Sequence, residues 1–598
     1  MKSVLTALLF SISLIFSIGM ASYAQDYEKG FKAYQSGDFA TALREWMPLA
    51  EQGNAAAQHN LGLLNFSGNG VDQNYKEAAK WFRKAAEQGV ADSQVILGAM
   101  YDGGMGVAQK YLQAIKWYRK AAEQGNLAAL VAMGTVYAEG KGLSQNLEEA
   151  VVWYRKAARQ NHAPAQVLLG IAYLDGNGVD QDYKEAKKWF QKAAEQGSVE
   201  GQAALGELYL KGNGVDQNYR KAAKLLYPAA ENGLSVPQIY LGMMYENGDG
   251  VVQDYKQAVQ WYRKAAEQGE ANAQLNLAVM YENGQGVIQD YKEAINWYRK
   301  AAEQGNAVAQ YNLGVGYEKG KGSVQDDLQA AMWFRKAAEQ GLAAAQYNLG
   351  VMYKKGKGVV TDYKQAVDWF RKAAEQGLAD AQYNLGVMYK NGDGVVEDYE
   401  QALNWLQKAV SQGSAEAKLV LGKMHLEGRG VTQNFTEAEK WIRESAEQGD
   451  RDAQNLLGAM YSDGLGVGAD YKEAVKWFRK SAEQGLPLAV YNLGVMYAEG
   501  KGIAQNYKEA VKLFLKSAEQ GEKVAQFKLG LQYVLGNGLA VDNLKGYMWL
   551  DISLLSGHEF KELATKTKDM LEETLSAEQL AVAKEFARDC VRKSYKGC

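Results

Sequence analysis

The chain has 598 residues and a formal net charge of −3 at pH 7, with 67 lysines and arginines balanced by 70 aspartates and glutamates. Neither end carries a basic or acidic tail. The sequence therefore lacks the cluster of lysines and arginines that binds a phosphate backbone, which argues against a nucleic-acid partner. A single conventional core is also excluded, because such cores stop growing at about 250–300 residues.

Residues 1–24 have the pattern of a secretory signal peptide. Lys2 precedes an apolar run from Val4 to Ile18, and small residues follow at Ser22 and Ala24, before Gln25. The run is short for a membrane-spanning helix and no stop-transfer pattern follows it. We therefore expect a periplasmic or secreted protein without stable membrane insertion. An uncleaved N-terminal anchor is the alternative.

Residues 25–54 are predicted to form an atypical helical hairpin that caps the N-terminal end. The turn at Gly37 and Asp38 is short, and Trp46 lies one place later than the tryptophan of the repeats that follow. Terminal units of repeat arrays are expected to deviate in this way. Pro48 falls inside the second helix of the hairpin, where we expect a kink.

Residues 55–557 contain a pair of glycines that recurs every 36 residues, fourteen times, without an insertion or deletion. The first glycine runs from Gly68 to Gly536 and the second from Gly70 to Gly538. A fixed period of this length indicates one supersecondary unit stacked on copies of itself. Such an array buries the apolar face of each unit on its neighbours.

The repeat around residue 290 shows the predicted unit. Ala273, Leu277 and Tyr281 share one helix face, which ends at a glycine loop. Asp290 begins a second helix, and Glu293 three residues later predicts a capping box. The cap position is Asp or Asn in thirteen of fourteen repeats, with Lys110 as the exception. Each unit is therefore helix, glycine loop, helix and glycine turn.

A tryptophan recurs in the second helix in twelve of fourteen repeats, with Leu225 and Leu513 as the exceptions. Small alanines flank this position, which favours burial between helices. The alternative is a platform for carbohydrate, and it requires the rings to be exposed to solvent. Near the Leu225 exception, Pro228 falls inside a second helix, where we expect another kink.

The repeat resembles a known family. Residues 309–341, AQYNLGVGYEKGKGSVQDDLQAAMWFRKAAEQG, carry nearly all of the pattern of the Sel1-like repeat, a relative of the tetratricopeptide repeat. The resemblance implies an all-α fold, an α/α right-handed superhelical solenoid of about 14 repeats whose first helices line a concave face. Residues 558–598 are predicted to form C-terminal capping helices, the last with a capping box between Ser576 and Gln579.

No residue pattern points to catalysis, a metal or another cofactor. The four histidines are far apart and lack metal-ligand spacing, and serine-nucleophile signatures are absent. We therefore do not expect an enzyme. Cys590 and Cys598 are the only cysteines. In an oxidising compartment they could form a disulfide, but spacing alone leaves two free thiols equally open.

One polar feature recurs just before the Leu-Gly step of the first helix. In the related tetratricopeptide superhelix the matching positions face the concave groove, where asparagines hold an extended peptide. An amide both donates and accepts, and tyrosine adds rigid contact area. The alternative is that Tyr-Asn is only the usual packing at these positions. The candidate peptide-binding residues are Asn276, Tyr311, Asn312, Tyr347, Asn348, Tyr383, Asn384, Tyr491 and Asn492.

These observations predict a non-enzymatic scaffold of the bacterial cell envelope or surface that binds a protein or peptide along the concave face. One alternative is an envelope factor that contacts peptidoglycan or an exported polysaccharide, which exposed tryptophans would favour. A second is a pathogen surface factor that binds host proteins.

Overall fold

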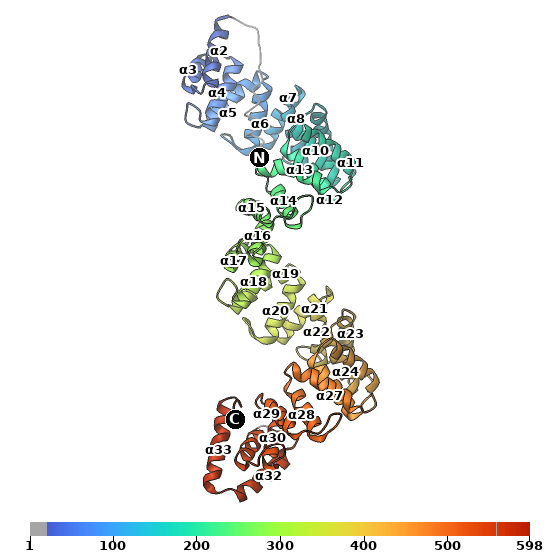
Figure 1. Cartoon of the computed structure of the whole chain (residues 1–598). Coiled ribbons are helices and arrows are strands. Elements are labelled where there is room, and N and C mark those ends of the chain that lie inside the picture. Colours follow the sequence, from blue (N-terminus) through green and yellow to red (C-terminus); the bar gives the residue numbers. More distant parts are fainter. Residues whose placement is uncertain (1–20, 556, 558) are drawn as a thin grey trace. The chain divides into compact units, whose positions relative to one another are not determined.

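The structure is a computed structural model that describes residues 21–555, 557 and 559–598. The predicted signal peptide lies almost wholly outside the described residues. The described part is helical and contains no strand. The chain divides into two compact units, Met1–Ala301 and Ala302–Cys598. In each unit, helical hairpins follow one another in chain order (Figure 1).

Within each unit, the first helix of a repeat typically packs on the second, and the second packs on the first helix of the next repeat. The helices of the first unit are α2 (Ala21–Gln35), α3 (Phe39–Glu51), α4 (Ala55–Ser67), α5 (Tyr75–Glu87), α6 (Ala91–Gly103), α7 (Tyr111–Glu123), α8 (Leu127–Glu139), α9 (Leu147–Arg159), α10 (Ala163–Asp175), α11 (Tyr183–Glu195), α12 (Val199–Lys211), α13 (Tyr219–Glu231), α14 (Ser235–Asn247), α15 (Tyr255–Glu267), α16 (Ala271–Asn283) and α17 (Tyr291–Glu303), whose last turn crosses the division.

The second unit continues the same alternation and ends in two further helices. Its helices are α18 (Ala307–Lys319), α19 (Asp327–Glu339), α20 (Ala343–Lys355), α21 (Tyr363–Glu375), α22 (Ala379–Asn391), α23 (Tyr399–Ser411), α24 (Ala415–Glu427), α25 (Phe435–Glu447), α26 (Arg451–Asp463), α27 (Tyr471–Glu483), α28 (Pro487–Glu499), α29 (Tyr507–Ala518), α30 (Lys523–Leu535), α31 (Asn543–Leu554), α32 (Lys561–Thr574) and α33 (Ala577–Arg592).

The helix starts are built as predicted, except for the capping box. Asp290 accepts hydrogen bonds from the N–H groups of Lys292 and Glu293. The N–H of Asp290 itself donates to the Tyr281 carbonyl at 3.0 Å, so it needs no carboxylate. Glu293 instead accepts from the indole of Trp297 at 2.9 Å. The expected box at this position is therefore wrong in its second half. Lys110 makes no side-chain cap.

The two loop glycines serve different purposes. Gly356 ends α20 in the left-handed conformation, with φ of +67°. Gly358 also has positive φ, and a Cβ there would overlap the backbone carbonyl of Asp327 at the start of α19. The first glycine stops the helix, and the second lets the loop approach the preceding repeat closely.

Neither internal proline interrupts its helix. α3 contains Pro48 and α13 contains Pro228, and both helices have the 13 residues of the regular second helices. Pro228 lies in the last turn, where its carbonyl accepts the backbone N–H and the side-chain amide of Asn232. A proline placed so near a C-terminus costs one helical hydrogen bond without ending the helix early.

At the N-terminal end, Trp46 is the centre of the first hairpin. Its side chain is 1% exposed, and its indole N–H donates to the Tyr27 carbonyl at 3.2 Å. Tyr27 and Tyr34 pack against the ring. The displaced tryptophan therefore closes the array with an aromatic cluster.

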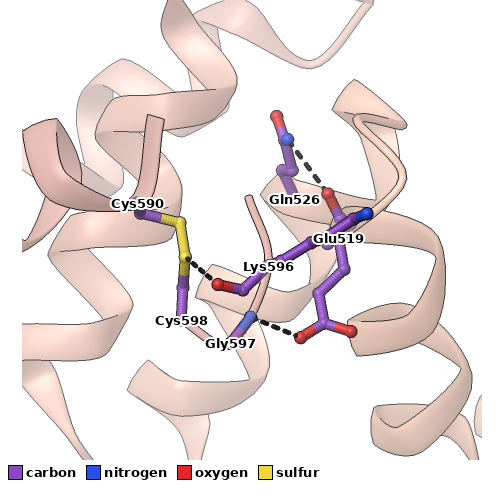
Figure 2. The surroundings of a disulfide bond; sticks show 7 residues. Glu519, Gln526, Cys590, Lys596, Gly597 and Cys598 are labelled. Carbon is purple, nitrogen blue, oxygen red and sulfur yellow. Dashed lines mark hydrogen bonds between the residues drawn. A yellow bond between two sulfur atoms is a disulfide. The ribbon is translucent and has the colours of Figure 1, made fainter. Parts of the chain in front are cut away.

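At the C-terminal end, α32 and α33 pack on α31. The predicted capping box between Ser576 and Gln579 is confirmed. A disulfide joins Cys590 on α33 to Cys598 at the end of the tail. The N–H of Gly597 donates to the carboxylate of Glu519 at 3.0 Å, which ties the tail to the end of α29 (Figure 2).

Candidate ligand-binding surface

The Tyr-Asn pairs occupy one equivalent position on α18, α20, α22 and α28, and all of these side chains are half-buried. Each tyrosine packs on the second helix of its repeat. The ring centroids are 5.7 Å apart for Tyr311 and Phe334, and 5.8 Å apart for Tyr347 and Phe370. The tyrosines are thus held rigidly, and part of their role is structural.

Partial burial changes the titration of these tyrosines. Desolvation raises the pKa of Tyr347 and of Tyr383 above the usual value for a phenol. Desolvation also raises the pKa of Tyr491 to about 12. The three hydroxyls are therefore neutral donors and acceptors at physiological pH, suited to hydrogen bonding and not to anion chemistry.

The asparagines divide into two groups. Asn384 accepts from Lys354 Nζ at 3.1 Å and donates to the Asp380 carbonyl at 2.9 Å. Asn312 and Asn348 make no side-chain hydrogen bond among the described residues. Two consecutive repeats therefore present an unengaged amide, and the third amide is already used within the protein.

The remaining candidates lie on other helices. Asn276 lies on α16 in the first unit. Asn492 lies on α28 and donates to Asn455 at 2.9 Å. Tyr491 packs on Phe514 with centroids 5.9 Å apart. Within the second unit, the predicted residues of α18, α20 and α22 belong to successive repeats.

The repeated tryptophans are covered. Trp261 is 3% exposed and Trp333 is 6% exposed. The lysine three residues later lies over the ring, at 4.1 Å for Lys264 and 4.2 Å for Lys336. An aromatic face that packs in the core and carries a lysine is not open to stack on a sugar. The arrangement favours the packing interpretation of the tryptophans.

A recurrent glutamine–glutamine contact at the junctions between repeats was not predicted from the sequence. Gln346 on α20 donates to the Ala338 carbonyl at the end of α19, at 3.1 Å. Its own carbonyl accepts from Gln376 in the next turn, at 2.8 Å. We call two such glutamines a junction pair. Further junction pairs are Gln58–Gln88, Gln94–Gln124, Gln166–Gln196, Gln238–Gln268, Gln310–Gln340, Gln382–Gln412 and Gln454–Gln484.

A second missed feature is a series of exposed aliphatic residues in the loops after the first helices. Val324, Val360 and Val396 are each 87% exposed or more, in three successive repeats of the second unit. The same position is also aliphatic and exposed at Val252 and Ile288 in the first unit, and is polar or small in the other repeats, as at Asp180 and Thr432. These aliphatic residues can be seen in the sequence, but the exposure of a loop residue cannot be judged without the fold.

The described residues contain no group of three histidine, cysteine, aspartate or glutamate side chains able to hold a metal ion. None of the described helices is both long and apolar enough to cross a bilayer.

The comparisons with known proteins agree with this architecture. The Sel1 repeat model matches fourteen consecutive segments between residues 55 and 558. The chain belongs to the Sel1 repeat family, a family of non-enzymatic helical scaffolds of the kind that typically mediates protein–protein interaction. No curated protein sequence matches the chain significantly.

Two solved structures illustrate the similarity. A protective antigen of uropathogenic Escherichia coli strains, described as displaying an SLR fold, is 36% identical, with a TM-score of 0.70. The match covers 74% of this chain and 96% of the antigen. A Sel1 repeat protein from Oxalobacter formigenes is 35% identical over 52% of this chain and 90% of its own, with a TM-score of 0.42.

Proposed function

We propose that this protein is an exported scaffold that holds a protein or peptide partner along the first helices of the second unit. The observation that carries the proposal is the pair of unengaged, half-buried amides of Asn312 and Asn348, each beside a tyrosine fixed by packing. An amide on each of two successive repeats can bond a peptide backbone at regular intervals. The concave face remains the expected location of this contact.

The proposed location is the cell envelope or its surface. The apolar run after Lys2 supports export. The Cys590–Cys598 disulfide fits an oxidising compartment, because such bonds are rare in the cytosol. The similarity to a protective antigen supports the same location. Cell fractionation with N-terminal sequencing of the recovered chain tests it: intact Met1 in a cytosolic fraction would reject export.

The proposed contact is tested with the double variant Asn312→Ala/Asn348→Ala. The immobilised mature chain first captures a partner from envelope extract, and the partner's affinity is then measured for each variant. We expect the double variant to bind at least tenfold more weakly, because each lost hydrogen bond costs about 0.5–1.5 kcal/mol. Its thermal midpoint should stay nearly unchanged, since neither amide bonds within the protein.

Two single variants serve as controls. Asn177→Ala removes an exposed loop amide of the first unit and should change neither binding nor stability. Asn384→Ala should lower stability, because it deprives Lys354 of a hydrogen-bond partner. Normal binding by a double variant that melts early would show that Asn312 and Asn348 are structural, and would end the proposal at this surface.

A further inference from the structure

A pocket lies in the first unit at a junction where the glutamine pair is missing. Leu130 on α8 occupies the position of the buried glutamine, so Gln160 has no glutamine to bind. The amide of Gln160 donates instead to the Lys156 carbonyl of its own helix, at 3.4 Å. The space left between the α7–α8 turn, α8 and α9 is a cavity of about 520 Å³. Cavities of this size hold small ligands or single side chains.

Three of the residues that line this pocket differ from the usual residue of the repeat. Leu130 replaces the usual glutamine, Val152 replaces a residue that is often lysine, and Arg159 replaces the usual glutamate. Unrelated drift would scatter such changes over the array. Here they turn one junction apolar at its floor and positive at its rim. The equivalent residues in neighbouring repeats are Gln94 and Gln166, Lys116 and Lys188, and Glu123 and Glu195.

The charge around the pocket is uncompensated. Arg155, Lys156 and Arg159 line it, and no carboxylate does so. None of these three cations forms an ion pair with any residue in the described part of the chain. Arg155 donates one hydrogen bond to the Tyr173 hydroxyl at 3.1 Å, which leaves other guanidinium donors free. Lys156 lies over the ring of Trp153, with Nζ 4.3 Å from its centroid.

We propose that this pocket binds an aliphatic carboxylate. The guanidinium groups of Arg155 and Arg159 suit a carboxylate, which accepts two parallel N–H donors from one arginine. The aliphatic group would pack on Val152, which is 39% exposed and gains by removal from water, above the already buried Leu130. The Gln160 amide supplies a further polar contact. This site goes beyond the proposed function, because it lies in the first unit and no Tyr-Asn residue lines it.

The carboxylate has two possible sources, the C-terminus of a peptide that ends in an aliphatic residue and a free small acid. Titration calorimetry of the full mature chain separates them with two probes, N-acetyl-Ala-Leu and 4-methylpentanoate. Two further probes are controls. The C-terminal amide of the same dipeptide tests whether a carboxylate is required, and inorganic phosphate tests whether an aliphatic group is required. We expect at least one carboxylate to bind, and at least tenfold more tightly than the amide or phosphate.

Two variants separate the charge from the cavity. Arg159→Glu restores the common glutamate and keeps the cavity, and Leu130→Gln lets a junction pair form with Gln160 and keeps the charges. Each should weaken binding at least tenfold, with helical content checked by circular dichroism. Val152→Asp, the residue at the equivalent Asp368, is a third variant. It replaces the aliphatic wall with an opposing charge, so it should also weaken binding at least tenfold, and it keeps the test decisive if another variant fails to fold.

The matched control is Glu267→Arg, which adds the same charge beside the closed pair of Gln238 and Gln268. It should leave binding unchanged. The proposal is overturned if neither carboxylate binds, if the amide or phosphate binds equally well, or if the folded variants keep the affinity of the parent chain.

Discussion

The junction at Gln346 and the junction at Gln202 share one backbone design, but the turn residue is one methylene group shorter at the second, and Gln202 makes no side-chain hydrogen bond within the described part of the chain. Gln376 reaches the carbonyl of Gln346 at 2.8 Å. At the other junction the turn residue is Asn232, whose shorter amide donates only to the Pro228 carbonyl, and the Gln202 carbonyl is buried without a partner. The flanking helices α12, α13 and α14 each keep 13 residues.

This difference shows which interactions specify the repeat and which only stabilise it. N-terminal caps on the second helices and loop glycines occur at both junctions, so the helices form at both. The junction pair adds hydrogen bonds to a fold that is already determined. Junctions without the pair are therefore where the array can change its surface without losing its architecture, as it does at Leu130 and Lys418.

The largest effect is expected when an intact junction is broken. Gln346→Leu copies the residue found at Leu130 and removes the side-chain donor to the Ala338 carbonyl, which keeps the N–H of Gly341. It also removes the acceptor of Gln376, whose amide keeps only the 3.5 Å bond to the Lys372 carbonyl. Each of the two lost hydrogen bonds costs about 0.5–1.5 kcal/mol. Hydrogen exchange should show the loss in α19–α22 more than at the ends of the unit, because repeats couple mainly to neighbours.

Gln365→Leu is the control for this variant, because Gln365 is exposed on α21 and the substitution has the same chemistry. Urea unfolding should place it within about 0.5 kcal/mol of the parent chain. Equal destabilisation by both variants, or none by Gln346→Leu, would mean that the junction pair adds no stability.

A middle-sized effect is expected at Lys418, where the junction carries charge. Lys418 takes the glutamine position, its side chain is only 11% exposed, and it pairs with Glu444 at 3.1 Å. Glu444 in turn replaces the lysine that covers a tryptophan in most repeats. The two departures compensate each other, so Glu444→Lys alone should cost about 1–2 kcal/mol by leaving two cations together.

The double variant Lys418→Gln/Glu444→Lys restores the common residues at both positions. We expect it to recover most of the stability that Glu444→Lys loses, with a coupling energy of at least about 0.5 kcal/mol in a double-mutant cycle of thermal unfolding. The coupling should shrink in high salt, since Glu444 is partly exposed. Strictly additive single effects would show that the two replacements are unrelated.

Local signals explain why the helices could be predicted from the sequence. The cap at Asp290 and the stop at Gly284 act within a few residues, so one repeat is enough to read them. The capping box failed because the Tyr281 carbonyl, nine residues away, had already taken the N–H of Asp290.

Contacts between repeats could not be predicted from the sequence, because they join residues that are far apart along the chain. A glutamine such as Gln346 looks like an ordinary polar helix residue until the preceding helix end and the following turn are placed beside it. The Tyr-Asn positions could be found by their recurrence, but not that Asn384 bonds Lys354 while Asn312 and Asn348 stay unengaged. The pocket at Leu130 likewise depends on three residues from two helices.

The smallest effect is a gain. Asn232→Gln lengthens the turn residue by one methylene group, so that its amide can reach the buried carbonyl of Gln202. The bond to the Pro228 carbonyl need not be lost, because Gln196 donates both to Gln166 and to the Lys192 carbonyl four residues before it. The variant should therefore stabilise the chain by about 0.5–1 kcal/mol, measured by urea unfolding. The same substitution in a Gln202→Leu background should gain nothing, because no acceptor remains there. A gain of equal size in both backgrounds would attribute the stabilisation to helix propensity in the turn and would contradict the role of the missing junction pair.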